Sequence, residues 1–355
     1  MRRAAAVCGS DADRGADGMT GPERADCVNT AAQDAEADGG YADIPADTRF
    51  EYEDTPDGIR LVRYLGDARV VRLPDAIGGR PVTVLASSAF YENGMQVEKI
   101  IVPGSVKRIE DSACEFCLCL QEMMLCEGVE ELGREFMVIS EQMELFVPAS
   151  VRRIDHPGEL GIRLRIHPDN PWYFDDGFGL YRKTEDGEQF LEMVLPSDKR
   201  TSYAVLAGTT GIADGAFENQ EFLEEITLPA SLTFIAEGAL SNMRQNFAQS
   251  DGICGIRIAA GNPKYFLQEA GLYERLGAQG IKLIRYLGNL LMLRLPEDTS
   301  EIGTGAFLNA KVQTVVIPAG VKRIYPEALW DVRCARLCSR RLTRHSICRI
   351  RQRIF

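Results

Sequence analysis

Short clusters of apolar residues recur along the chain at a nearly constant spacing. Each cluster places apolar residues six, three and one positions before a proline, as Val97, Ile100 and Val102 stand before Pro103. This spacing predicts a short, half-buried β-strand that ends at the proline, because proline has no N–H group to donate to a neighbouring strand. A second apolar pair follows after a turn, and a small residue followed by a bulky one closes the unit.

The spacing of these units predicts a solenoid. Successive proline positions, some of them occupied by other residues, recur with a period of about 22–23 residues, which is typical of repeat architectures. They are Pro103, Cys126 and Pro148; Ala207 and Pro229; Pro296 and Pro318. The closing bulky residue follows each of them at a fixed distance, at Cys114, Phe136, Phe217, Leu240, Phe307 and Leu329. No single unit can bury its apolar face, so we expect stacked coils with one continuous core and short parallel strands about 4.8 Å apart. We predict this β-rich solenoid for residues 49–331.

A longer unit is nested within the short one. The stretch "NPWYFDDGFGLYRK" at 170–183 matches "NPKYFLQEAGLYERL" at 262–276, with an offset of 92 residues between Asn170 and Asn262. Likewise "VRYLG" at 62–66 returns as "IRYLG" at 284–288. The chain therefore consists of duplicated blocks, each of several repeats.

The repeat resembles a known family. An apolar strand, "IP-x-S-V-x-x-I", "AF", a cysteine three residues later and then a leucine together resemble the BspA-like leucine-rich repeat, with Cys117 and Leu120 at the last two positions. "GRPV" at 79–82 resembles an insertion in the first repeat of such arrays, and the "NP-x-Y-F" blocks resemble a recurrent interruption. The resemblance extends from about residue 50 to about residue 330. It implies a leucine-rich-repeat-like array with a period of about 22–23 residues, with roles in adhesion or recognition, often at a bacterial cell surface.

The two ends of the chain differ in composition from the repeats. Residues 1–48 contain twelve alanines and ten acidic residues with few large apolar side chains, so we expect this segment to be disordered. Residues 332–355 contain eight arginines and no acidic residue, and we expect a basic, disordered tail. The whole chain has a net charge of -12, which argues against nucleic acid as its main partner.

No stretch approaches the length of a membrane span, about 18 continuous apolar residues, and the first residues lack the apolar region of a secretory signal. A cytoplasmic location is the default expectation, and a secreted or surface location follows if the true start lies upstream.

Two groups of cysteines could hold zinc. Cys114, Cys117, Cys119 and Cys126 lie close in sequence, but three of them occupy repeat landmarks and are better explained as core thiols. The second group is Cys334, Cys338, His345 and Cys348 in the basic tail, a looser zinc pattern. We expect no metal and no cofactor, and a zinc site in the tail is a weaker alternative.

Catalytic motifs are nearly absent. Only His156, His167 and His345 are available, the first two in an eroded repeat, and no HExxH, GxSxG or phosphate-loop pattern occurs. We expect a protein that is not an enzyme.

The outward face of the strands is the remaining candidate for function. Two residues before each proline position the side chain should point away from the core, which defines a column that begins with three apolar residues: Ile101, Met124, Phe146, Arg165, Val194, Val205, Thr227, Arg257, Arg294 and Val316. A second column, two residues earlier, is richer in charge: Lys99, Glu122, Glu144, Glu192 and Glu225. An apolar stripe flanked by charge is typical of a protein-binding surface, although β-propensity alone also favours such residues on an exposed sheet. We predict partner-binding residues at Lys99, Ile101, Met124, Phe146, Arg165, Thr227, Arg257, Arg294 and Val316.

These patterns support a non-enzymatic interaction or adhesion module that binds a protein or glycan partner on its sheet face. An intracellular scaffold of the same fold is the main alternative.

Overall fold

The computed structural model describes residues 43–137, 143–157, 162–195, 200–217, 220, 223–240, 255–288, 290–308, 310, 312–330, 332 and 334–338. The chain divides into two units, Met1–Asp43 and Ile44–Phe355, and all described strands belong to the second. Disorder was expected over 1–48, and of this segment 1–42 lies outside the described ranges. Within its last part, the Asp47 N–H already donates to the Arg72 carbonyl at 2.8 Å.

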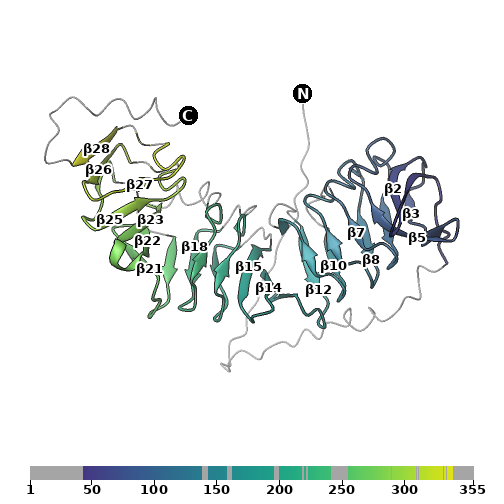
Figure 1. The fold of residues 1–355 in the computed structure, drawn as a ribbon, viewed down its shortest axis with the longest axis horizontal. Coiled ribbons are helices and arrows are strands. Elements are labelled where there is room, and N and C mark those ends of the chain that lie inside the picture. Colours follow the sequence, from purple (N-terminus) through teal and green to yellow (C-terminus); the bar gives the residue numbers. More distant parts are fainter. Residues whose placement is uncertain are drawn as a thin grey trace, which may run out of the picture. The chain divides into compact units, whose positions relative to one another are not determined.

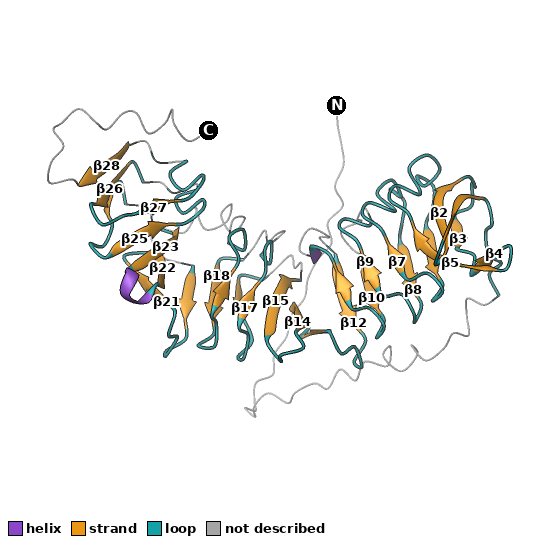
Figure 2. Cartoon of the chain, viewed as in Figure 1, coloured by secondary structure: helices purple, strands orange, loops and turns teal. Residues whose placement is uncertain are grey.

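Strands and turns make up nearly all of the described chain, and the strands are stacked in chain order (Figures 1 and 2). The predicted β-solenoid is confirmed. Its strands form two groups of sheets on two sides of each coil. Those that precede the proline positions form what we call the front sheets, and those after the turn form the back sheets.

The front sheets consist of parallel strands in the orders β3-β6-β8, β10-β12, β16-β18-β20 and β24-β26-β28. Their bounds are β3 (Val70–Arg72), β6 (Lys99–Val102), β8 (Glu122–Leu125), β10 (Glu144–Val147), β12 (Arg163–Ile166), β16 (Ser202–Ala204), β18 (Glu225–Leu228), β20 (Ile256–Ile258), β24 (Met292–Arg294), β26 (Thr314–Pro318) and β28 (Cys334–Cys338).

The back sheets follow the orders β1-β2-β5-β7-β9-β11, with β4 beside β5, then β13-β14-β15-β17-β19 and β21-β22-β23-β25-β27. The bounds in the first are β1 (Phe50–Thr55), β2 (Gly58–Tyr64), β4 (Ala76–Ile77), β5 (Arg80–Leu85), β7 (Arg108–Ile109), β9 (Glu131–Leu132) and β11 (Arg153–Ile154). Those in the second are β13 (Tyr173–Asp175), β14 (Gly179–Lys183), β15 (Gln189–Val194), β17 (Gly211–Ile212) and β19 (Phe234–Ile235). Those in the third are β21 (Tyr265–Gln268), β22 (Gly271–Arg275), β23 (Ile281–Tyr286), β25 (Thr299–Ile302) and β27 (Arg323–Ile324), with a short 3-10 turn at Gly277–Gln279.

Each back sheet begins with antiparallel strands and continues with parallel ones. β1 and β2 are antiparallel, as are β13, β14 and β15, and again β21, β22 and β23. The duplicated blocks of the sequence are therefore units that each open with an antiparallel hairpin. We call them block 1 (β1–β12), block 2 (β13–β20) and block 3 (β21–β28).

The registers of the parallel strands confirm the repeat period and correct one landmark. Lys99 pairs with Glu122 and Arg108 pairs with Glu131, each partner lying one predicted period further along the chain. In block 2, however, Ala204 pairs with Thr227. Leu206 therefore corresponds to Pro229, and the choice of Ala207 for this position was wrong by one residue.

Most strands that precede a proline end where the sequence predicts. β6, β10 and β18 each end one residue before their prolines. β26 differs because Pro318 remains in register with Cys338 of β28. Strand β28 lies within the segment 332–355 that was expected to be unstructured, and it extends the front sheet of block 3 beyond residue 331.

The closing bulky residues pack inside the coils, although Leu329 is only partly buried. Cys114, Phe136, Phe217 and Phe307 are almost fully buried, and Leu240 is 3% exposed. The core comprises three clusters whose boundaries fall within the hairpins, since Leu180 packs in the first cluster and Tyr181 in the second. Tyr273 of the next hairpin begins the third cluster.

Candidate functional site

The front sheets bring the predicted partner-binding residues into adjacent positions, two at a time. The registers pair Ile101 with Met124, Phe146 with Arg165, Thr227 with Arg257, and Arg294 with Val316. Each pair lies on neighbouring strands of one sheet, so the predicted column exists within each front sheet.

The exposure of these side chains varies along the column. Phe146 is 40% exposed, and the side chains of Arg257 and Arg294 are 69% and 64% exposed. The remaining outward members are partly buried: Met124, Arg165, Thr227 and Val316.

Ile101 is a correction to the expected apolar stripe, because it is only 1% exposed. It does not belong to the core cluster that holds its neighbours Ile100 and Val102. It lies on β6, the middle strand of its sheet, in register with Arg72 on one side and Met124 on the other. These two neighbours flank Ile101 at the spacing of adjacent strands.

Three other members of the predicted columns also lie inside. Val194 and Glu192 belong to β15, a back-sheet strand, and Val205 follows the one-residue shift described above. Val194 is fully buried and Val205 is 5% exposed. Glu192 is 9% exposed and pairs with Arg182 at 2.6 Å. Burial raises the pKa of Glu192, and the positive charge of Arg182 opposes this shift.

Charges of the second column are paired across neighbouring strands. Lys99 contacts Glu122 at 2.7 Å, and Arg257 contacts Glu225 at 2.8 Å. Solvent-exposed pairs of this kind contribute little to stability. The front face is therefore a surface of mixed charge around Phe146 and Met124.

The first cysteine group is divided between core and surface. Cys114 and Cys117 are buried, Cys126 is partly buried and Cys119 is exposed. The hydrogen bond with Cys117, together with burial, raises the pKa of the Cys114 thiol well above its ordinary value. Across the described ranges, no three His, Cys, Asp or Glu side chains gather as metal ligands would. Cys334 and Cys338 lie on β28, while His345 and Cys348 lie outside the described residues.

The two described histidines lie shortly after the strands β11 and β12. His167 accepts a hydrogen bond from the Asp169 N–H through Nδ1 at 3.1 Å, and its ring lies 5.9 Å from that of Phe146. His156 is exposed, with a φ of 48°.

No described helix is both long and apolar enough to cross a membrane.

Two exposed apolar patches were missed by sequence reasoning. Tyr91 and Phe116, on successive coils, form an edge-to-face ring contact at 4.3 Å, and Leu118 nearby is 60% exposed. Leu291 and Met292, at the start of β24, are 63% and 61% exposed. The run "NLLML" at 289–293 breaks the alternation expected of a half-buried strand, and this signal could have found the second patch.

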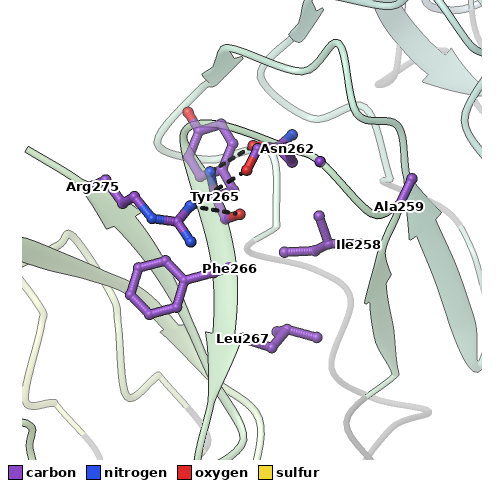
Figure 3. A pocket seen from close by; sticks show the side chains of 8 residues that line it. Ile258, Ala259, Asn262, Tyr265, Phe266, Leu267 and Arg275 are labelled. Atoms are coloured by element: carbon purple, nitrogen blue, oxygen red, sulfur yellow. Dashed lines mark hydrogen bonds between the residues drawn. The ribbon is translucent and has the colours of Figure 1, made fainter.

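A pocket of 260 Å³ lies where block 2 meets block 3 (Figure 3). It is lined by Ile258 and Ala259 at the end of β20, by Gly261 and Asn262 in the connection, and by Tyr265, Phe266, Leu267 and Arg275 of the hairpin. Sequence reasoning did not find this pocket, because its residues come together only through the hairpin.

The geometry agrees with comparisons to known proteins. A model described as the BspA type leucine rich repeat region matches the chain in 6 copies, over residues 77–156, 198–251 and 280–351. The chain belongs to this family. The matched segments continue past residue 331, and the unmatched intervals 157–197 and 252–279 contain the hairpins that open blocks 2 and 3. A comparison with curated proteins found no match.

Several solved structures are similar to this chain. One is a leucine rich cell surface protein from Faecalibacterium prausnitzii, at 15% identity and a TM-score of 0.44, covering 84% of this chain and 95% of that one. A leucine-rich repeat protein from Eubacterium ventriosum has 14% identity and a TM-score of 0.43, covering 79% and 77%. The pneumococcal vaccine antigen PcpA has 17% identity and a TM-score of 0.37, covering 80% and 67%.

Proposed function

We propose that this chain is a non-enzymatic interaction module whose front sheets bind a protein partner. The observation that supports this most directly is the register of the front strands, which aligns outward side chains such as Phe146 and Arg165 on neighbouring strands. Repetition multiplies modest contacts into a long surface, as in other solenoid binding proteins. The family resemblance also suggests adhesion, a narrower form of this proposal, and a glycan partner as the alternative to a protein.

Phe146 and Met124 are the residues on which the proposal depends most. Phe146 is 40% exposed on an edge strand, and aromatic residues dominate the binding energy of many interfaces. Met124 is partly buried and lies in register with Ile101, and methionine adapts readily to different partners. The paired charges around them, such as Lys99 with Glu122, would form a polar rim.

The test compares partner capture by the full chain with capture by the double variant Met124→Ser, Phe146→Ser. We expect a partner captured by the natural chain to be lost or strongly weakened with the variant, while the circular dichroism spectrum stays unchanged. The control is Tyr91→Ser, Leu118→Ser, which removes two side chains outside the front strands that are more exposed, at 58% and 60%. Equal capture by the front-face variant, or loss only with the control, would remove the front-face assignment.

A further inference from the structure

The front sheets are interrupted where a new block begins, and each interruption leaves a strand edge. β12 and β20 are the last strands of their sheets. The His167 N–H donates back to β10, so the N–H of the preceding residue, Ile166, points away from β10. Successive N–H groups of a strand point to opposite sides. The Ala259 N–H donates to Leu228 of β18, so the Ile258 N–H points away from β18. The two edge positions, Ile166 and Ile258, are separated by the 92-residue offset of the blocks.

In block 2, an aspartate side chain accepts a hydrogen bond from the N–H group at the edge of β12. The Asp175 Oδ2 atom accepts a hydrogen bond from the Ile166 N–H at 3.0 Å. Its Oδ1 atom accepts from the Gly177 N–H, also at 3.0 Å, which fixes the side chain in place. A carboxylate is a strong acceptor for a backbone N–H, so Asp175 satisfies the edge that β12 would otherwise present to solvent.

Block 3 has a leucine where block 2 has this aspartate. Leu267 lies 92 residues after Asp175, and its side chain contains no atom that could accept the Ile258 N–H. Leu267 is 36% exposed and lines the pocket together with Ile258. Figure 3 shows the Ile258 and Leu267 side chains on one side of the strand and the Phe266 and Arg275 side chains on the other. At the first block junction the Asp175 carboxylate lies against the Ile166 N–H. At the second, the corresponding residues Ile258 and Leu267 line a pocket.

The pocket also carries a positive charge. The Arg275 guanidinium lies over the Phe266 ring, with its central carbon 4.4 Å from the ring centroid. Its Nη1 atom makes long contacts of 3.3–3.4 Å with three backbone carbonyls, those of Asn262, Pro263 and Tyr265. In the part of the chain that the structure describes, Arg275 forms no ion pair with a carboxylate, so its charge can act on a ligand.

We propose that this pocket binds the carboxylate of an aspartate or glutamate side chain from a partner protein. The Ile258 N–H would donate to it as the Ile166 N–H donates to Asp175. Arg275, which lines the same pocket from across the strand, would add a longer-range attraction. The apolar walls formed by Ile258, Ala259 and Leu267 would hold the side chain's methylene groups. The pocket lies in the interval 252–279 that the family model does not match, and it is independent of the front-face proposal.

The test follows the Ile258 amide by NMR while the isotope-labelled full chain is titrated with N-acetyl-aspartate N-methylamide. We expect saturable shifts of the Ile258 amide with millimolar affinity, which is typical of a single small contact. The matched probe is the asparagine analogue, which has nearly the same shape without the charge and should shift this amide little. Saturable binding of the aspartate probe alone supports the proposal; no binding, or equal binding of both probes, overturns it. This comparison decides the proposal on the unmodified chain.

Three variants sharpen the assignment. Leu267→Asp should supply the missing carboxylate from within the chain and abolish the shift at Ile258. Asp175→Leu should open the equivalent site in block 2 and produce a new shift at the Ile166 amide. Arg275→Gln should weaken the binding of the aspartate probe several-fold, because a nearby positive charge is lost. Undiminished binding to the Leu267→Asp chain would overturn the proposed site, and unchanged affinity for Arg275→Gln would remove Arg275 from it.

Discussion

At the scale of single residues, ion pairs between coils that are distant in sequence hold the first hairpin to the repeats. Arg60 of β2 donates to Glu110 through Nε and Nη2, at 3.1 and 2.7 Å, across 50 residues of chain. Glu110 also accepts from the Ser87 N–H at 3.0 Å. The hydrogen bonds from Arg60 lower the pKa of Glu110 below its ordinary value of 4.5.

This pair predicts a pH dependence of stability. Because the folded chain binds the Glu110 proton less readily than the unfolded chain, the pair stabilises the fold above pH 4.5 and its contribution declines as the pH falls below that value. We expect Glu110→Gln to lower the free energy of unfolding by about 1 kcal/mol at neutral pH and by progressively less in acid. Urea unfolding at a series of pH values measures this.

The control for Glu110 is Glu53→Gln. Glu53 contacts the same arginine at 3.0 Å, but its side chain is 61% exposed, so little change is expected at any pH. A Glu110→Gln deficit that stays constant from neutral to acid pH would contradict the ion-pair explanation.

At the scale of elements, one asparagine joins each new hairpin to the coil before it. The Asn170 Nδ2 atom donates to the carbonyls of Pro148 and Val151, both at 2.9 Å. Its Oδ1 atom accepts from the N–H groups of Trp172 and Tyr173, at 2.9 and 2.8 Å. Asn262 makes the same four contacts 92 residues later: with the carbonyls of Pro229 and Leu232 and the N–H groups of Lys264 and Tyr265. The repeated "NP-x-Y-F" stretch is therefore an anchor between blocks.

Removing this anchor should destabilise the junction. Asn170 is 4% exposed, so Asn170→Ala would leave buried carbonyl and N–H groups without their partner. We expect a loss of about 2 kcal/mol in the free energy of unfolding, measured by urea denaturation. The exposed neighbour provides the control, since Asp169→Ala should change stability far less. Similar losses for the two variants would show that the four hydrogen bonds are not the cause.

At the scale of the whole molecule, stability should be distributed locally along the stacked coils. Each coil packs mainly on its neighbours, and the three buried clusters share only the hairpins between blocks. The large negative charge of the chain, -12, adds a general repulsion that more salt would reduce.

Local stability predicts a gradient of effects from one core substitution. Phe217 is 1% exposed in the second cluster, and Phe217→Ala should cost about 3–4 kcal/mol there. Hydrogen exchange should show the greatest loss of protection in β16 to β19 and the smallest in β2, β5 and β7. A uniform loss across all three blocks would mean that the solenoid unfolds as one cooperative unit.

The sequence by itself determined the repeat period, the strands that end at prolines and most of the buried closing residues. Those features follow from local rules, because strand alternation, the missing N–H of proline and the period of one coil are all properties of neighbouring residues. Phe146 and Arg165 could therefore be paired on one face before the fold was known.

Only the tertiary structure decided which outward positions reach solvent and where the front sheets break. Ile101 is only 1% exposed on the middle strand of its sheet. Val194 lies on β15, which pairs with the hairpin strand β14 and so belongs to a back sheet. Beside the pocket, two strand edges that match in sequence meet different side chains, Asp175 in one block and Leu267 in the other. Such outcomes depend on contacts between coils, which the spacing of residues along the chain does not specify.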